Sequence, residues 1–288
     1  MSSERPKLLV FSDFTETLLD DTPHCENAKA VISELQSMDV SIIFCSSKTR
    51  AEIEYHMEEL GVCDSFIAES GGEIVIPKNY FPFSYRFSKH TKNADIIELA
   101  IPYTVVREKL AKIKLETGAG IVGFGDLSTE EIATETGMPL NLAKLSKHRV
   151  YNEPCRLLWG NMNDVVDAAE KEGLSIVNGE KYFHLIGGSN KGKAINVLKD
   201  MYAQAFEGII TFGVGDFPMD TFMLKVVDMP LMVRKVAGGR NAHLVAWQNL
   251  FRLITQKIGR EISFNVLGEQ QSTLSCQNHT SPITAPKC

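Results

Sequence analysis

Short apolar runs alternate with amphipathic segments near the start of the chain. Residues 7–12 (KLLVFS) and 40–45 (VSIIFC) are predicted to be strands buried on both faces, because they do not alternate between polar and apolar residues. Residues 27–38 and 53–60 carry apolar residues at helical spacing. This strand–helix–strand–helix order predicts an α/β fold, in which a doubly wound parallel sheet is covered by helices on both faces.

The regular alternation of strands and helices stops in the middle of the chain and then resumes. Residues 65–68 and 73–76 are predicted to form a hairpin, and the following strands and short helices no longer alternate regularly. After Lys191, a helical pattern over 192–202 and a strand over 208–214 resume the alternation. We therefore expect a core split by an inserted α+β domain, and a Gln/Ser/Thr/Pro-rich, disordered tail. The expected parts are 1–82 and 189–267 for the core, 83–188 for the insertion, and 268–288 for the tail.

The composition of the chain limits the classes of molecule that we expect it to bind. The chain has 288 residues, 44% of them hydrophobic, and its net charge of -6 gives no general attraction for nucleic acid or an anionic membrane. No apolar run approaches the ~20 residues of a membrane span, and we do not expect the polar N-terminus to act as a secretory signal. Six cysteines without a CxxC pair are interpreted as reduced thiols. We expect a cytoplasmic monomer or homodimer that binds a small molecule.

Polar residues follow several predicted strands at the point where each strand ends. Asp13 and Ser46 follow the first two strands, Asp216 and Asp220 follow a later one, and Lys191 opens a helix. Ligands of open α/β sheets bind at the carboxyl ends of the strands. A carboxylate can attack phosphorus, two carboxylates suit Mg²⁺, and a hydroxyl and an ammonium can hold phosphate oxygens. Each residue alone also fits a cap, a turn or a solvated charge, but their shared order favours a phosphoryl-transfer site.

This order of motifs resembles the haloacid dehalogenase-like phosphatases. VFSDFTETLLD with Asp13 is similar to their first motif, Ser46 to the second, Lys191 to the third and GVGDFPMD to the fourth. An insertion between the second and third motifs resembles the type IIB cap of the Cof-like branch. The segments CSSKTR, FIAESGG, GFGDL, RVYNE and NKG resemble the mannosyl-3-phosphoglycerate phosphatases within that branch.

The resemblance implies a Rossmann-like core with a cap and a Mg²⁺-dependent phosphatase. It implies hydrolysis of a phosphorylated sugar-glycerate, mannosyl-3-phosphoglycerate, to mannosylglycerate and phosphate through an aspartyl-phosphate on Asp13. The implied catalytic residues are Asp13, Thr15, Ser46 and Lys191. The implied metal ligands are Asp13, Thr15 through its carbonyl, Asp216 and Asp220. The implied substrate-binding residues are Ser47, Lys48, Arg50, Asp126, Arg149 and Glu153. His148 and His184 match no motif and are interpreted as ordinary surface or core histidines.

Four residues depart from the family pattern. Thr15 stands in place of a second aspartate, Glu16 in place of Gly, and Ser70 and Met219 each in place of Asn. In the family that aspartate protonates the leaving oxygen and then activates water, which a threonine hydroxyl cannot do at neutral pH. Three interpretations follow: a slow phosphatase, a phosphotransferase with a long-lived phosphoenzyme, or a silent protein that only binds a phosphorylated ligand.

Overall fold

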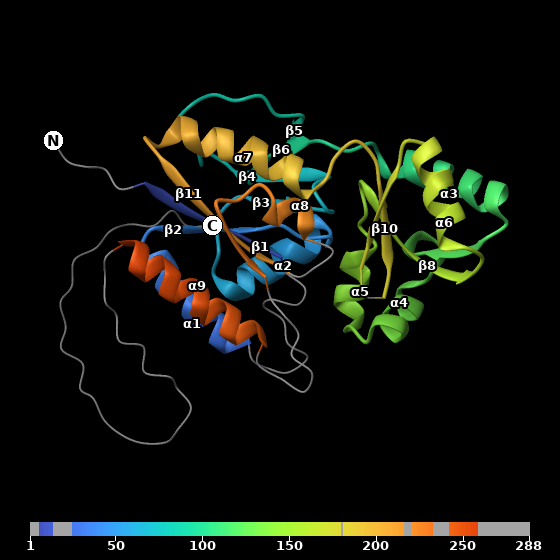
Figure 1. The fold of residues 1–288 in the computed structure, drawn as a ribbon, viewed down its shortest axis with the longest axis horizontal. Helices are drawn as coiled ribbons and strands as arrows, with labels where there is room; N and C mark the ends of the chain where they lie inside the picture. The colour runs from blue at the N-terminus through green and yellow to red at the C-terminus, as the bar shows by residue number, and fades with distance from the viewer. Residues whose placement is uncertain (1–5, 14–24, 180, 216–219, 233–241, 259–288) are drawn as a thin grey trace, which may run out of the picture.

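The protein is represented by a computed structural model (Figure 1), which describes residues 6–13, 25–179, 181–215, 220–232 and 242–258. The side chains of residues 25–28, 242–246 and 257–258 are not described. The predicted site residues Thr15 and Asp216, the departures Glu16 and Met219, and the expected tail therefore lie outside the described residues.

Four parallel strands form the central sheet, in the order β12-β11-β1-β2. They are β1 (Lys7–Ser12), β2 (Val40–Phe44), β11 (Ile209–Gly215) and β12 (Met229–Met232). Leu8 and Val10 of β1 pack into one hydrophobic cluster, whereas Leu9 and Phe11 pack into another on the opposite face. Burial on both faces confirms the interpretation of the first apolar run and the predicted α/β fold class.

Helices cover both faces of this sheet, as Figure 1 shows. On one face lie α1 (Cys25–Ser37), α2 (Arg50–Leu60) and α9 (Ala242–Ile258), with α1 beside α9. On the other face lie α7 (Lys191–Ala205) and the short α8 (Thr221–Leu224). The observed helices overlap the predicted ones, with ends that shift by a few residues.

An antiparallel sheet of order β3-β4-β6-β5 continues from the central sheet. Its strands are β3 (Phe66–Ala68), β4 (Glu73–Pro77), β5 (Lys89–His90) and β6 (Ala94–Glu98). A parallel bridge between Cys45 and Ile67 joins it to the end of β2. The predicted hairpin is confirmed as β3 and β4. The division into parts remains a proposal, and the pairing of β6 with β4 favours a first boundary after Glu98 rather than at residue 83.

Residues 99–188, here called the insertion, carry a third sheet of order β7-β8-β10-β9. The strands are β7 (Gly120–Gly123), β8 (Asn152–Trp159), β9 (Ser175–Asn178) and β10 (Phe183–Ile186). The helices are α3 (Tyr103–Thr117), the 3-10 turn η1 (Phe124–Asp126), α4 (Thr129–Thr136), α5 (Leu140–Ser146) and α6 (Met162–Lys171). α3 and α6 cover one face of the sheet, where Val106, Val165 and Leu185 share a hydrophobic cluster. β9 and β10 pair with each other as antiparallel strands.

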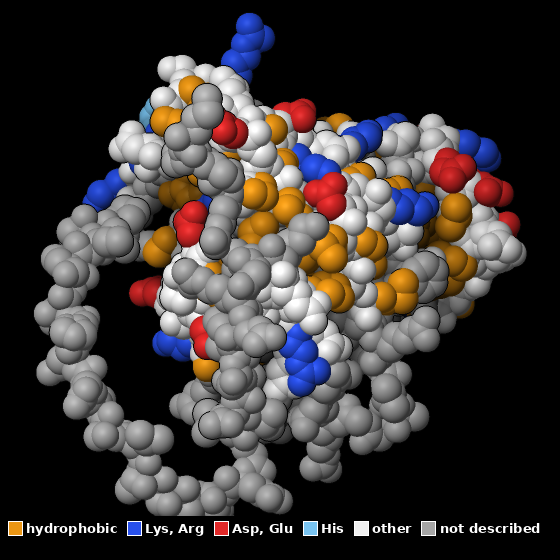
Figure 2. All heavy atoms as spheres, turned by 60° about the vertical axis from the view of Figure 1, so that its left-hand side comes forward, with side chains coloured by type: hydrophobic (Ala, Val, Ile, Leu, Met, Phe, Trp, Pro, Cys, Tyr) orange, Lys and Arg blue, Asp and Glu red, His pale blue; other side chains and the backbone are white. Residues whose placement is uncertain are grey.

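The cysteines differ in part from the expectation. Cys45 and Cys155 are buried free thiols, but Cys63 is disulfide-bonded, so the interpretation as a reduced thiol is wrong there. Within the described ranges, no helix is long and apolar enough to cross a membrane. On the face in Figure 2, acidic and basic side chains are interspersed among the described residues.

A glycine turn between β3 and β4 lies directly against the start of α7. A Cβ on Gly71, where φ is +96°, would lie 2.3 Å from the Asn190 carbonyl carbon and 2.8 Å from the Lys191 nitrogen. Gly61 is a matched control, because its φ is +68° and nothing lies within 4 Å of its added Cβ.

We predict that Gly71→Ala destabilises the protein more than Gly61→Ala does. Both substitutions place alanine at a positive φ, which lowers the free energy of unfolding by roughly 1–2 kcal/mol. Only Gly71→Ala adds a backbone clash, which lowers it by about 1–3 kcal/mol more. Urea unfolding of the two variants measures the difference, and equal free energies of unfolding would contradict the close packing described above.

Candidate active site

Backbone hydrogen bonds fix the strand ends at one edge of the sheet. The Asp13 N–H donates to the Val214 carbonyl at 3.0 Å, which holds Asp13 beside the end of β11. The Ser46 N–H donates to the Ile67 carbonyl at 3.0 Å, which holds Ser46 beside the end of β3. The polar residues that follow β1 and β2 are therefore brought to one edge, as the sequence predicted.

Lys191 forms the centre of this edge. Its Nζ lies 2.7 Å from Asp13 Oδ1 and 2.5 Å from Asp220 Oδ1, and all three residues are buried. Burial opposes the charged ammonium, but the carboxylates of Asp13 and Asp220 outweigh it, so the pKa of Lys191 is raised above its ordinary value. The site therefore holds a permanent positive charge next to Asp13.

Ser46 is buried at the start of the loop that leads to α2. Its Oγ accepts a hydrogen bond from the Lys48 N–H at 3.3 Å. The neighbouring Cys45 is fully buried, and burial raises the pKa of its thiol in spite of the nearby Lys191. Cys45 is thus a neutral packing residue, which leaves the Ser46 hydroxyl as the polar group contributed by this strand end.

The donor chemistry at this edge fits a hard divalent cation. Asp13 and Asp220 bring buried carboxylates, and Mg²⁺ takes oxygen ligands while keeping several waters. Thr15 and Asp216, the other two predicted ligands, lie outside the described residues. Among the described residues, no group of three or more His, Cys, Asp or Glu side chains could hold a metal ion.

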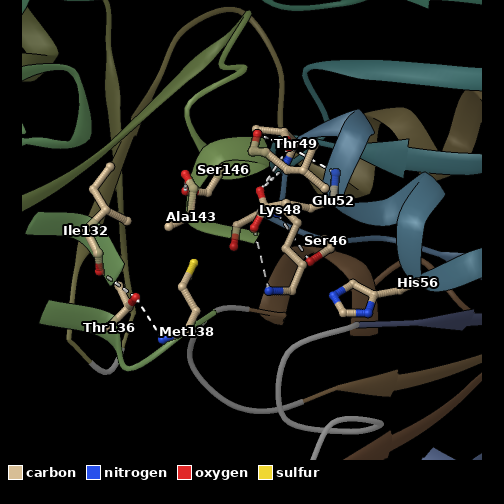
Figure 3. Close-up of polar contacts among 12 residues, drawn as sticks. Ser46, Lys48, Thr49, Glu52, His56, Ile132, Thr136, Met138, Ala143 and Ser146 are labelled. Carbon is tan, nitrogen blue, oxygen red and sulfur yellow. Dashed lines mark hydrogen bonds and ion pairs between the residues drawn. The ribbon is translucent and has the colours of Figure 1, made fainter. Parts of the chain in front are cut away.

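The loop after β2 connects the core to α5 of the insertion. Thr49 caps α2, and its Oγ1 also donates to the Leu145 carbonyl at 3.0 Å. Lys48 Nζ lies 3.8 Å from Glu52 Oε1. Figure 3 shows Ser46, Lys48 and Glu52 on the core side facing Ala143 and Ser146 of the insertion. Lys48 is thus brought to the boundary between the two parts.

Glu69 holds the start of β8 against the core. Its fully buried carboxylate accepts hydrogen bonds from the backbone N–H groups of Val150, Tyr151 and Asn152 at 2.8, 2.9 and 2.9 Å. Glu69 itself sits at φ 47°, in the left-handed region that a side chain rarely adopts. We name this contact the Glu69 hook. The sequence did not predict it, because Glu69 binds backbone N–H groups, and the residue types at 150–152 do not indicate such a contact.

Arg149 supports the same junction. Its Nη1 donates to the Ser47 carbonyl at 2.6 Å and to Asn152 Oδ1 at 2.9 Å, and its Nε donates to the Ser146 carbonyl at 2.9 Å. Its Nη2 lies 3.7 Å from Glu52 Oε2. Arg149 and Ser47 are therefore brought together, but the guanidinium already binds protein groups and joins the insertion to the core.

Three other predicted residues lie away from Lys191. Glu153 is completely buried, and it accepts from the Gly125 N–H at 3.0 Å and from the Tyr103 hydroxyl. Asp126 pairs with Arg107 and Lys114, and these ion pairs hold the pKa of its carboxyl below the usual range despite burial. Arg50 lies 4.0 Å from Glu73 at the base of the junction. The structure does not bring Asp126, Glu153 or Arg50 to the strand-end cluster.

We predict that Lys191→Met destabilises the protein by about 3–5 kcal/mol at pH 7, because it leaves two buried carboxylates without their shared cation. The carboxyl pKa values would then be raised in the folded state, so the loss should shrink as the pH falls through them. Lys171→Met is the control: its pair with Glu116 is exposed and worth about 0–1 kcal/mol. Unfolding in metal-free buffer at pH 7 and pH 5 tests this, and similar losses in both variants would contradict it.

Comparisons with known proteins show the family of this chain. The haloacid dehalogenase-like hydrolase family matches residues 10–136. The chain is 37% identical over 235 residues to the glucosyl-3-phosphoglycerate/mannosyl-3-phosphoglycerate phosphatase of Methanococcoides burtonii, covering 81% of this chain and 86% of the relative. It is 38% identical over 225 residues to the mannosyl-3-phosphoglycerate phosphatase of Pyrococcus horikoshii, covering 78% and 90%.

The fold is also shared with a solved sugar phosphatase of HAD subclass IIB. The TM-score is 0.58 at 13% sequence identity, and the match covers 88% of this chain and 99% of the other. The predicted resemblance and fold class are thus confirmed. The chain belongs to the haloacid dehalogenase-like hydrolases, in the branch that contains the mannosyl-3-phosphoglycerate phosphatases.

Proposed function

We propose that this protein hydrolyses mannosyl-3-phosphoglycerate to mannosylglycerate and phosphate, with Asp13 as nucleophile and Mg²⁺ as cofactor. The observation that carries the proposal is the buried Lys191 ammonium between Asp13 and Asp220, at the carboxyl ends of parallel strands. The substrate follows from the names of relatives that match most of the chain, one of which also names glucosyl-3-phosphoglycerate.

In the proposed mechanism an Asp13 carboxylate oxygen attacks phosphorus, the bond from phosphorus to the glycerate oxygen breaks, and that oxygen takes a proton from solvent water to become a hydroxyl. Water then attacks the aspartyl-phosphate, which releases phosphate and restores Asp13. Lys191 stays charged because its pKa is raised, so it stabilises negative charge on the phosphoryl oxygens. The Ser46 hydroxyl binds one of those oxygens.

Asp13, Asp216, Asp220 and the Thr15 carbonyl are the proposed ligands of Mg²⁺. When bound, the ion neutralises charge on the phosphate and helps to orient it. Lys48 and Ser47 are proposed to bind the organic part of the substrate, because both lie where the core meets the insertion. We also propose a cytoplasmic protein, monomeric or homodimeric, that acts on a small sugar phosphate and not on nucleic acid or membranes.

Thr15 favours a second candidate function. General acid–base catalysis is worth ~10²–10⁴-fold, and Thr15 cannot supply it at neutral pH. A phosphoenzyme that water discharges slowly would suit transfer to another acceptor, and a protein without turnover would only bind its ligand. Arg50, Asp126 and Glu153 are less suited to substrate binding under any of these functions, because their partners lie elsewhere.

We predict that Asp13→Asn lowers phosphate release from mannosyl-3-phosphoglycerate with Mg²⁺ by more than about 10³-fold, because the nucleophile is lost. Asp39→Asn is the control, since the Asp39 side chain is 86% exposed and pairs only with Lys7 among the described residues. Phosphate release should be measured with the mannosyl and glucosyl substrates. Retained turnover in Asp13→Asn would refute the assigned nucleophile.

We predict that Thr15→Asp raises kcat by about 10²–10⁴-fold, because it restores a carboxyl acid and base beside the phosphoryl group. Single-turnover kinetics with the labelled substrate separate formation of the aspartyl-phosphate from its hydrolysis. If the variant binds substrate tightly but still releases no phosphate, the binding-only function replaces the phosphatase proposal.

A further inference from the structure

The strand β10 directs one polar side chain toward the core. Phe183 and Leu185 belong to the hydrophobic cluster under α3 and α6, so His184 between them projects from the opposite face of the sheet. Its neighbour on that face, Ile186, pairs with Asn152, whose side-chain amide donates to Ser70 Oγ in the core at 3.4 Å. The face that carries His184 is therefore the one turned toward the core.

The imidazole of His184 lies near the strand-end cluster. The charges of Arg149 and Lys191, and in the opposite sense that of Asp13, all act on it. Burial is the main reason that its pKa is lowered, to about 3, and both cations lower it further. His184 is consequently a neutral imidazole within electrostatic reach of the proposed nucleophile.

This histidine is unusual for a buried packing residue. It is only 8% exposed, yet its Nδ1 has no hydrogen-bond partner among the described residues. The Ser189 hydroxyl, two residues before Lys191, is likewise buried and unpartnered there. Buried polar groups normally have partners, and leaving one unsatisfied is costly. A ligand oxygen beside His184 Nδ1 would supply the hydrogen-bond partner that these described groups do not.

The position of His184 limits which part of a ligand it could meet. In a 3-phosphoglycerate ester the carboxylate is two bonds from the phosphorylated carbon, whereas the sugar extends further from the phosphate. At His184 the charges of Arg149 and of Lys191 each act more strongly than the opposing charge of Asp13, which favours an anionic group over a hydroxyl. A neutral imidazole can donate one N–H to such an oxygen.

We propose that His184 is a substrate-binding residue that donates a hydrogen bond to the glycerate carboxylate and so selects phosphoglycerate esters over other phosphate esters. The assignment deepens the proposed function and rests on it. It replaces the sequence interpretation of His184 as an ordinary histidine.

The test compares two ligands that differ at one group: 3-phosphoglycerate has a carboxylate where glycerol 3-phosphate has CH₂OH. Their affinities are measured by calorimetry with Mg²⁺ for wild type, His184→Leu and His184→Asn. His148→Leu is the matched control, since His148 is an exposed histidine in the same insertion. A lost hydrogen bond to a charged group corresponds to roughly 10–100-fold in affinity.

We expect His184→Leu to weaken the binding of 3-phosphoglycerate by about 10–100-fold and the binding of glycerol 3-phosphate by less than about 3-fold. Asn places an amide where Nδ1 stood, so His184→Asn should recover most of the affinity, whereas His184→Gln should not. Equal weakening of both ligands, or of neither, would overturn the proposal. If His184→Leu does not fold, the comparison of Asn with Gln decides it.

Failure of the proposed function has a different signature. In that case wild type releases no phosphate from mannosyl-3-phosphoglycerate, whatever the two binding ratios are. If phosphate is released and His184→Leu lowers turnover of p-nitrophenyl phosphate as much as that of mannosyl-3-phosphoglycerate, the phosphatase proposal stands and the role of His184 falls.

Discussion

One buried ammonium holds together three distant pieces of the chain. Lys191 is 178 residues from Asp13 and 29 from Asp220, yet both carboxylates contact its Nζ. None of these charges could be buried at low cost without the others, because removal from water penalises an isolated ion heavily. The end of β1 and the starts of α7 and α8 must therefore assemble together, and the insertion must return to the core at this place.

The junction between core and insertion is organised around polar contacts of a different kind. The Glu69 hook binds backbone groups of the insertion, and Arg149 returns the contact by donating to the Ser47 carbonyl. Tyr151 extends the junction, since its hydroxyl donates to Glu98 at 2.6 Å. These contacts set the insertion over the strand ends, with one face of its sheet turned toward Lys191. The same face carries His184. The junction therefore positions the side chain that we propose to bind the substrate carboxylate relative to the charge cluster.

Much of the fold could be predicted from the sequence, because buried parallel strands need uninterrupted apolar runs and their helices need an apolar stripe. The strand that ends at Ser12 follows from that rule, and Asp13 then follows from where parallel strands place their carboxyl ends. β7 was missed, because its four residues include two glycines and show no strand period. Glu153 was assigned to the substrate from family resemblance, but the alternation of β8 turns it toward Arg107 on α3. Such contacts depend on sheet register, which single residues do not reveal.

The Glu69 hook has a consequence for how this protein can change. Its three hydrogen bonds end on main-chain nitrogen atoms, and almost every amino acid supplies the same N–H group. Proline is the exception, because it lacks that hydrogen. A substitution of Val150, Tyr151 or Asn152 by any residue other than proline therefore keeps these three hydrogen bonds, although the Tyr151 and Asn152 side chains make junction contacts of their own. Glu69 itself cannot be exchanged in this way, because a shorter or neutral side chain would weaken its hydrogen bonds with all three N–H groups at once.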